Sequence, residues 1–535
     1  LEDLQFGLDN KGRSHRFGLS AAPPAELAAR IDVRGEINGD LGEALDHLSG
    51  RIFLELDYAD LAGWRAWVDE PVYLPQGRGA LRLWGDLADS QGKLTADLAL
   101  EDVRVRLGRK VPELALDNLR GRLVGRYKEN DWAVAGSKVE LLAADGTRVA
   151  PTDFQAEWKQ EGEAGRVSGS AVASFLDFAV LGKLAAYLPL DPRSRELLER
   201  HRPQGRISEL RAAWTRQGDD LQRYSLKANF ADLGLLAGGY FPGAKGLSGL
   251  VELTEAGGSV SLDSQKAGVS LPAVFSEPDI AVDLLRARAS WKVAGEVVDV
   301  KLERLQFEGA DATGTASGSY RHSGDGPGTI DLAATVARAN GAAVWRYLPK
   351  SIGQDVRDWV RRGIVSGKAS DGKLILKGNL ADFPFRDGNK GAFLVTARAT
   401  DVTLDYASDW PRIEGIDADL SFGVGMRIVA ERGNLLGARL SGVTAEIPDL
   451  ESLDEMLNIR GEAQGPTGEF LRFIEQSPVS AKIDHFTQGM KAEGTGRLEL
   501  AFDLPLRRPQ DTRLRGDYRF QNNQLELLAA LPPLT

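Results

Sequence analysis

Apolar and polar residues alternate with a period of two along several stretches of the chain. In a β-strand, such alternation places the apolar side chains on one face of the sheet and the polar side chains on the other. We therefore expect strands with one dry face and one wet face. The apolar positions of the clearest stretches are Ile52, Leu54, Leu56 and Tyr58; Val298, Val300 and Leu302; Leu420, Phe422, Val424, Met426 and Ile428; and Leu498, Leu500, Phe502 and Leu504.

Few segments have the helical period that could cover such a sheet. The clearest helix is expected from Ser351, a favourable N-cap residue, to Gly363, and a second from Asp191-Pro192 to about Arg202. The apolar face of the first would hold Ile352, Val356, Trp359 and Val360.

Short helices of this kind cannot roof the many strands that the pattern predicts. Soluble proteins rarely expose contiguous apolar patches of more than a few hundred Å². The sheet must therefore fold on itself as a sandwich or barrel, or curl into a trough whose floor is filled by something else. The fold class is mostly β, and we expect an elongated, twisted antiparallel sheet that forms an open groove with a few short amphipathic helices.

Composition narrows the class of protein. The chain has 535 residues with 60 glycines, about 11% against roughly 7% in average proteins, which indicates frequent turns between short strands. Its net charge of −11 is spread along the chain and makes nucleic acid a poor partner. With no cysteine, disulfides and thiolate metal sites are excluded. No signal peptide or run of about 18 apolar residues occurs, so we expect a segment of a longer protein whose membrane anchor lies elsewhere.

A tripeptide and its surroundings recur. Tyr187-Leu188-Pro189 and Tyr347-Leu348-Pro349 each precede an amphipathic helix, then a glycine (Gly205, Gly367), then a strand; Tyr73-Leu74-Pro75 is a looser echo. Duplicated units indicate a repeat array. We expect four segments: residues 1–175, an N-terminal β-groove segment; 176–340 and 341–450, each with a Tyr-Leu-Pro helix and strands; and 451–535, a C-terminal β segment.

The residues that could carry chemistry favour no catalytic or metal site. The five histidines, His15, His47, His201, His322 and His485, lack metal-ligand spacing. Neither a nucleophile elbow nor a complete phosphate-binding loop occurs. Carboxylates such as Asp401 and Asp405, or Asp417 and Asp419, share the polar face of strands, where solvation is the simpler interpretation, although a glycosidase pair stays open. No cofactor is expected.

The segment around the second Tyr-Leu-Pro carries a resemblance to a known family. Tyr347-Leu348-Pro349, Trp359, Gly363, Gly367 and Phe383-Pro384-Phe385 follow one another in an arrangement that resembles the YhdP family of AsmA-like bacterial envelope proteins. The resemblance implies a long groove-forming β-sheet, periplasmic and anchored in the inner membrane in the full-length protein, that helps phospholipid move between the inner and outer membranes. It implies no catalytic residue.

Together with the uncovered apolar face, the resemblance implies a phospholipid-transport protein that is not an enzyme, in which the alternating apolar residues bind lipid. The rival from another class is a β-rich envelope scaffold whose dry face is closed by its own side chains, and the third is a glycan-acting enzyme. We expect the apolar positions to line one continuous concave surface with the Tyr-Leu-Pro helix across or beside it. Two face-to-face sheets with interdigitated interiors would contradict this expectation.

Overall fold

The computed structural model describes residues 2–40, 49–64, 73–88, 91–107, 111–162, 165–188, 192–218, 220–239 and 241–526. The chain divides into two compact units, an N-terminal unit of Leu1–Val260 and a C-terminal unit of Ser261–Thr535. Its strands form one antiparallel sheet of 26 strands that does not close on itself. The mostly β fold with few short helices is therefore confirmed, while the division into four sequence segments stays a prediction.

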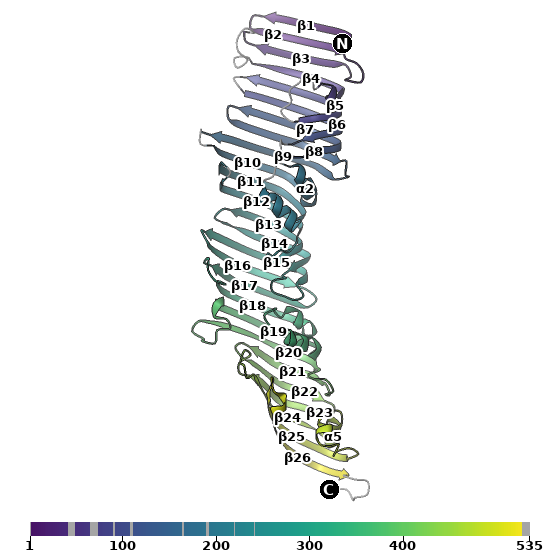
Figure 1. Cartoon of the computed structure of the whole chain (residues 1–535), viewed down its shortest axis with the longest axis vertical. Helices are drawn as coiled ribbons and strands as arrows, with labels where there is room; N and C mark the ends of the chain where they lie inside the picture. The colour runs from purple at the N-terminus through teal and green to yellow at the C-terminus, as the bar shows by residue number, and fades with distance from the viewer. Residues whose placement is uncertain are drawn as a thin grey trace. The chain divides into compact units, whose positions relative to one another are not determined.

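Strands β1 to β13 belong to the N-terminal unit (Figure 1). Each pairs with its neighbour in the sequence, so the unit is a continuous meander. Their bounds are β1 Glu2–Lys11, β2 Ser14–Ala22, β3 Ile31–Asn38, β4 Ser49–Asp60, β5 Tyr73–Ala88, β6 Gln91–Arg106, β7 Leu114–Lys128, β8 Asp131–Ala143, β9 Arg148–Glu161, β10 Arg166–Asp177, β11 Gln204–Gln217, β12 Asp220–Leu235 and β13 Gly243–Thr254.

Strands β15 to β26 form the same kind of meander in the C-terminal unit, and β14 (Gly257–Ser270) contains the boundary between the units. Their bounds are β15 Asp279–Ala294, β16 Val297–Glu308, β17 Ala312–His322, β18 Thr329–Asn340, β19 Ile364–Asn379, β20 Gly391–Leu404, β21 Ile413–Phe422, β22 Met426–Leu435, β23 Ala438–Ile447, β24 Met456–Pro466, β25 Lys491–Pro505 and β26 Arg513–Glu526.

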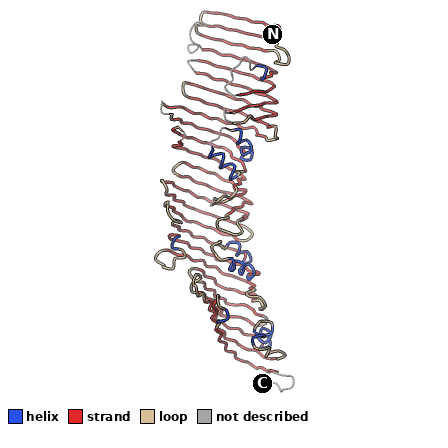
Figure 2. Tube along the Cα trace, in the orientation of Figure 1, coloured by secondary structure: helices blue, strands red, loops and turns tan. Residues whose placement is uncertain are grey.

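Among the described residues, the α-helices all lie on connections from an even-numbered strand to the next odd-numbered one (Figure 2). Because successive strands run in opposite directions, these connections share one edge of the sheet in each unit, which we call the helix rim. The opposite edge, built from shorter connections, is the turn rim. The helical segments are α1 Leu61–Trp64, α2 Phe178–Leu184, η2 Ala185–Tyr187, α3 Pro192–His201, η3 Gly341–Tyr347, α4 Gln354–Gly363, η4 Leu380–Asp382, α5 Thr467–Glu475, α6 Val479–Lys482 and η5 Pro509–Asp511.

The strand register sorts side chains by polarity in the C-terminal unit. Cross-strand partners point to the same face, so a line of partners can be followed from strand to strand. One such line is polar on every strand from β15 to β26: Arg286, Gln306, Thr315, Thr335, Lys373, Thr396, Ser421, Arg427, Glu446, Asn458, Asp503 and Arg513.

The adjacent line, one residue along each strand, faces the other way and is apolar on every strand from β15 to β23. We call this apolar face the floor and the polar face the outer face. The apolar line is Ala287, Leu305, Ala316, Ala334, Leu374, Val395, Phe422, Met426 and Ile447.

The N-terminal unit has a floor of the same kind. One line of partners from β1 to β13 contains no polar side chain: Leu8, Phe17, Gly35, Ile52, Gly85, Leu94, Gly125, Val134, Ala156, Ala171, Ala212, Leu226 and Leu253. The outer face carries a line of mostly alternating charges from β1 to β7: Asp9, Arg16, Glu36, Arg51, Asp86, Lys93 and Arg126.

Glycines on the floor make room for aromatic rings from the next strand. A Cβ at Gly136 would lie 2.2 Å from the Phe154 ring, and one at Gly169 would lie 2.5 Å from the Trp214 ring. Each glycine is the direct cross-strand partner of that aromatic residue. The rings therefore lie across the neighbouring strand, which explains part of the high glycine content.

Bulges interrupt the alternation without interrupting the floor. Asp102 has φ +50°, and the register of β5 against β6 shifts there, from Arg78–Glu101 to Gln76–Arg104, while Leu100 and Val103 pack in one floor cluster. At a bulge, two residues of one strand lie opposite one residue of its partner. Floor residues therefore change from even to odd sequence positions across the bulge, but their side chains still point to the floor. Lys138 in β8, with φ +49°, has the same role.

Helices cover the floor near the helix rim of the N-terminal unit. Val180, Leu184 and Tyr187 of α2 and η2 pack on a buried cluster of floor residues that includes Leu100 and Val103. A smaller cluster, Ala28, Ile31, Leu56 and Ala59, joins β3 and β4 to the connection that precedes β3. Among the described residues, the buried apolar clusters both belong to this unit.

Two expected elements differ from the structure. The stretch from Leu420 to Ile428 is not one strand, because residues 423–425 form the turn between β21 and β22 and Val424 lies in that turn. Helix α4 begins at Gln354 with Gly353 as its N-cap, not at Ser351. The alternation could not reveal the turn. With three connecting residues, the floor residues of both strands fall at even sequence positions, as they would in one continuous strand. Asp191 and Pro189 lie outside the described residues.

We predict that Leu100→Ala lowers the thermal unfolding midpoint by several degrees. Leu100 is 1% exposed within a packed cluster, and truncation of such a leucine costs about 2–5 kcal/mol. Leu94→Ala is the matched control, because Leu94 lies on the same face of the same strand but is 52% exposed. Calorimetry that finds equal shifts for the two variants would contradict the distinction between covered and open floor.

Candidate functional site

The candidate site is the floor between the two rims. Of the residues predicted from the sequence, Val298, Val300 and Leu302 lie on β16, and Leu498, Leu500, Phe502 and Leu504 lie on β25. The structure brings Leu420 opposite Ile428 and Phe422 opposite Met426. Phe502 lies on the same line of cross-strand partners, which runs from Ile428 through Ala445 and Ile459 to Phe502. Val424 is the exception, since it lies in the turn.

Sequence analysis missed floor residues beyond bulges and in strands with many alanines. Leu305 and Phe307 continue the floor of β16 after a register shift, and Leu374, Leu376 and Phe393 continue it on β19 and β20. A search that allowed one inserted residue in each alternating stretch could have found Leu305 and Phe307.

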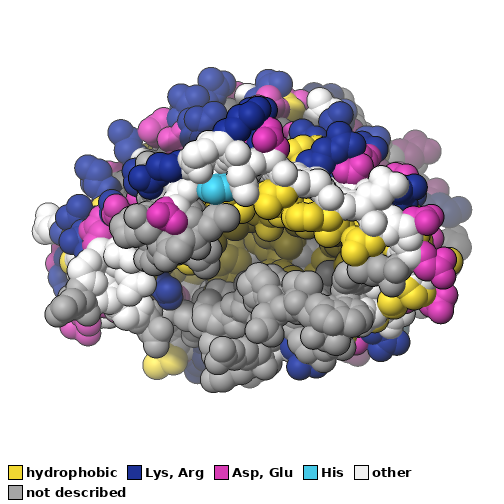
Figure 3. Space-filling view, turned by 90° about the horizontal axis from the view of Figure 1, so that it is seen from above, with side chains coloured by type: hydrophobic (Ala, Val, Ile, Leu, Met, Phe, Trp, Pro, Cys, Tyr) yellow, Lys and Arg dark blue, Asp and Glu magenta, His cyan; other side chains and the backbone are white. Residues whose placement is uncertain are grey.

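The floor is open over much of its area. Figure 3 shows hydrophobic side chains inside a hollow, with Lys, Arg, Asp and Glu side chains outside it. Floor residues Ile52 and Leu94 are 47% and 52% exposed. The accessible surface of the chain is 32985 Å², whereas two compact domains of half its mass would together expose about 23,000 Å². The excess is what an uncovered sheet produces, and a sandwich with an interdigitated interior is contradicted.

The second Tyr-Leu-Pro motif anchors the helix rim of the C-terminal unit. The Tyr347 hydroxyl donates to Asp311 Oδ2 at 2.9 Å, and Arg346 Nη1 pairs with the same carboxylate oxygen at 2.9 Å. Partial burial, with the Asp311 hydrogen bond and charge adding to it, raises the pKa of Tyr347 to about 12. Leu348 caps η3, and its backbone N–H donates to Trp345. The motif therefore ties η3 to the connection between β16 and β17.

The residues that follow attach the rim to a further connection, at 271–278. Pro349 forms a β-bridge with Phe275, whose ring packs edge-on against Tyr347. The Lys350 backbone N–H donates to the Val274 carbonyl, and its Nζ donates to the Pro272 carbonyl at 2.6 Å. In the first motif, Tyr187 packs on the buried cluster, and Arg195 of α3 donates to the Leu188 carbonyl at 3.4 Å. Both motifs thus hold a helix at the helix rim.

Trp359 continues the attachment toward the C-terminal end of this rim. Its indole N–H donates to the Tyr406 carbonyl at 3.0 Å, and the ring contacts Tyr406–Trp410 and Trp410–Phe473 lead on to α5. Gly363 is the buried last residue of α4. Gly367 has φ +140°, and a Cβ there would lie 2.7 Å from Val402 Cγ2, so this position requires glycine.

Phe383-Pro384-Phe385 borders the floor from the turn rim, at the other end of β19. The Phe383 ring packs against floor residue Phe393 with centroids 5.1 Å apart. Phe385 is buried and lies over Gly378 and Gly391. The two motif segments that carry the family resemblance therefore stand at opposite ends of one strand.

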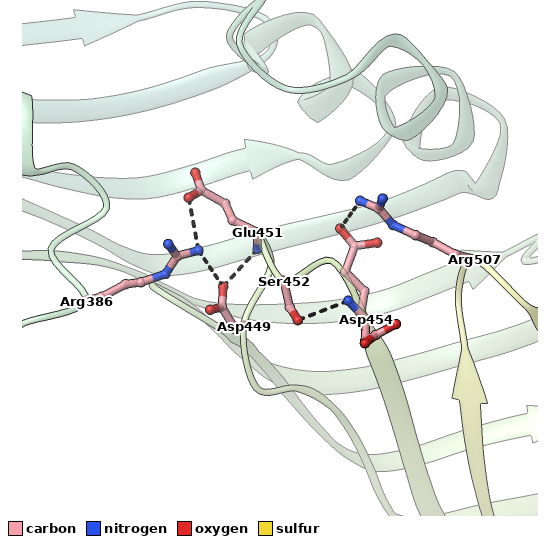
Figure 4. Close-up of polar contacts among 7 residues, drawn as sticks. Arg386, Asp449, Glu451, Ser452, Asp454 and Arg507 are labelled. Atoms are coloured by element: carbon pink, nitrogen blue, oxygen red, sulfur yellow. Dashed lines mark hydrogen bonds and ion pairs between the residues drawn. The ribbon is translucent and has the colours of Figure 1, made fainter.

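An ion-pair cluster joins connections along the turn rim of the C-terminal unit (Figure 4). Arg386 pairs with Asp449 at 3.1 Å and with Glu451 at 3.2 Å, which links the β19–β20 connection to the β23–β24 connection. The Leu450 N–H donates to the Val424 carbonyl in the intervening turn, and Arg507 pairs with Glu455 at 3.7 Å. Ion pairs therefore join separate connections along this turn rim, in addition to the packing of Phe383 and Phe385.

The described residues offer little for other chemistry. They contain no group of three or more His, Asp and Glu side chains placed to hold a metal ion. No helix among them is long and apolar enough to cross a membrane. Most ion pairs lie on exposed side chains at the outer face, such as Arg82–Glu55 at 2.7 Å and Lys377–Asp331 at 2.9 Å.

The fold and site define a class: an open β-sheet protein with a groove whose floor is apolar and whose rims are structurally distinct. Comparison with known proteins agrees. The chain belongs to the YhdP family, whose model, described as YhdP protein, matches residues 1–535.

A relative is the intermembrane phospholipid transporter YhdP of Escherichia coli (strain K12), which is 24% identical over 521 residues. The match covers 92% of this chain and 39% of the relative, so the chain spans well under half of the relative's length. No solved structure matches the chain.

We predict that Tyr347 titrates near pH 12, above its usual value near 10. Because folding raises this pKa, its contribution to stability is fully present below pH 10 and is lost as pH rises through about 12. Phenolate absorbance of the parent minus that of Tyr347→Phe isolates the group, which is necessary because burial also raises the pKa of Tyr406 to about 12. Asp311→Asn should lower the pKa of Tyr347, and an unchanged pKa in that variant would contradict the Asp311 contact; titration near 10 in the parent would contradict the burial of Tyr347 as well.

Proposed function

We propose that this chain is a section of a phospholipid conduit, in which acyl chains lie on the floor and polar headgroups stay at a rim in water. The observation that carries the proposal is the floor itself, whose lines of cross-strand partners run apolar over many consecutive strands in each unit. The name of the Escherichia coli relative, an intermembrane phospholipid transporter, supports the same function.

The lipid-binding residues we propose are the floor positions expected from the sequence, together with Leu305, Leu374 and Val395. Transfer of acyl chains from water to such a surface gains about 0.8 kcal/mol for each buried CH₂ group. The gain needs no directional bond, because it depends on the apolar area removed from water. Neighbouring positions along the floor are chemically alike, so a lipid can move between them without a bound cofactor.

Charged residues do not cross this path, because the register places nearly all of them on the opposite face, and Arg216 lies at the turn-rim end of its strand. Asp503 and Phe502 are neighbours in β25, yet Asp503 partners Asn458 while Phe502 partners Ile459. A self-packed scaffold is less well supported, since the helices leave floor residues such as Leu94 half exposed. A glycan-acting enzyme has no support among the described side chains beyond exposed ion pairs.

The cellular location and the partners follow from the same proposal. We propose a periplasmic protein of the bacterial envelope that is anchored to the inner membrane and reaches the outer membrane through parts outside this chain. Its partners would be phospholipids and the two membranes, and nucleic acid would not be among them. The proposal assigns it no catalytic activity.

We predict that Leu500→Arg or Phe502→Arg strongly reduces lipid transfer in cells that carry the full-length protein. A charge on the floor costs several kcal/mol when an acyl chain must pass over it. Glu499→Arg is the matched control, because the same charge on the adjacent residue faces water on the outer side, where Glu499 is paired with Arg519 at 3.8 Å.

The measurements are outer-membrane permeability and lipid transfer, after expression and folding of each variant are verified. Mass spectrometry of lipid extracted from the purified chain separates the groove from the scaffold. Intact transfer in well-folded floor variants would show that the groove is not the route, and repeated absence of phospholipid would favour the scaffold.

A further inference from the structure

An aromatic row crosses the floor of the N-terminal unit near its turn rim. Tyr127, Trp132 and Trp158 are successive cross-strand partners on β7, β8 and β9. The line continues through Gly169, which lies under the Trp214 ring, to Trp214 on β11 and Tyr224 on β12. We call Tyr127, Trp132, Trp158, Trp214 and Tyr224 the aromatic row.

The row lies between an apolar zone toward the helix rim and a zone of mixed polarity at the turn rim, both on the same face. One step toward the helix rim, two residues along each strand, the partners are Gly125, Val134, Ala156, Ala171, Ala212 and Leu226. One step toward the turn rim, the line is Gln160, Val167, Arg216 and Leu221, so that polar and apolar residues alternate there. Each step is about 6.6 Å, so the polar groups of Gln160 and Arg216 lie only a short distance from the apolar zone.

The rings are accessible from the groove and have unused polar groups. Tyr127, Trp132 and Trp158 are 39%, 48% and 37% exposed. In the part of the chain that the structure describes, no residue accepts a hydrogen bond from the indole N–H of Trp132, Trp158 or Trp214, in contrast to Trp359, which donates to the Tyr406 carbonyl. Arg216 is exposed and has no carboxylate partner among these residues.

Tyrosine and tryptophan favour the boundary between apolar and aqueous surroundings, because each has an apolar body and one polar group. The opposite edge of this floor cannot receive a headgroup, since α2, η2 and the buried cluster around Leu100 fill it. A phosphate there would have to be buried among apolar side chains, at high cost.

We propose that lipids in the N-terminal unit lie across the groove, with their ester and phosphate groups at the aromatic row and their acyl chains toward the helix rim. The inference rests on the proposed function, because it requires lipid on the floor. The free indole N–H groups donate to ester or phosphate oxygens, and Arg216 pairs with the phosphate from the turn rim. One rim of the groove is therefore the headgroup side.

Tryptophan fluorescence tests this orientation. The full chain is loaded with phosphatidylcholine that carries a nitroxide quencher either beside the ester or near the terminal methyl of the acyl chain. The difference between the parent and Trp158→Phe isolates Trp158. We expect the ester-side quencher to reduce its fluorescence at least about twofold more than the chain-end quencher does, because the two labels lie more than one floor step of about 6.6 Å apart.

A second reporter on the same strand provides the matched control. Phe154→Trp in the Trp158→Phe background places an indole two floor steps nearer the helix rim, and there the chain-end quencher should be the stronger one. Trp84, whose ring contacts Phe53 and Arg122 on the outer face, should respond to neither.

Equal or reversed quenching at Trp158, in a chain whose circular dichroism is unchanged, would overturn the orientation and leave the groove proposal in place. Absence of quenching at both Trp158 and the reporter at position 154 would instead contradict lipid occupancy of this unit. The expected opposite order at the two positions supports the orientation.

Discussion

The register of each strand against its neighbour in the sequence is the constraint on which the rest of the structure depends. Side chains directly opposite each other on antiparallel strands share a face, and a slip of one residue would move a whole apolar set to the other side. Asp503 and Phe502, or Arg427 and Met426, differ by one position and face opposite surroundings. Hydrogen bonding between sequence neighbours carries this separation from strand to strand, and the result is an apolar floor opposite a charged outer face.

Local irregularities preserve that separation. Bulges at Asp102 and Lys138 add a residue to a strand and change the sequence parity, but the side chains beyond them return to the same face. Glycines such as Gly136 give the neighbouring Phe154 ring a place to lie across the strand. The floor therefore stays regular although the sequence alternation does not. At a bulge the backbone accommodates the extra residue, and at a glycine the absence of a side chain leaves room for the neighbouring ring.

The two rims follow from the meander. Connections of one parity share an edge, so helices inserted at Tyr187 and Tyr347 stand on the helix rim of their own units, where they are held by side-chain packing and by the Asp311 contacts. The other edge keeps short connections and is held in the C-terminal unit by exposed charges such as Arg386 with Asp449. An open floor between unlike rims gives a bound amphipathic molecule different surroundings on its two sides.

The sequence by itself determined the strand class, the scarcity of helices, the two Tyr-Leu-Pro helices and the family resemblance, because alternation, turn residues and helix boundaries are local properties of the chain. It also placed Leu420, Phe422, Leu500 and Phe502 on an apolar face correctly. Only the tertiary structure decided that residues 423–425 form a turn, that Leu305 continues the floor beyond a bulge, and that Arg386 meets Asp449. Those features depend on the register between strands, and so does the alignment of the aromatic row. Register is set by bulges and hydrogen bonds between segments, which a period of two along one strand does not specify.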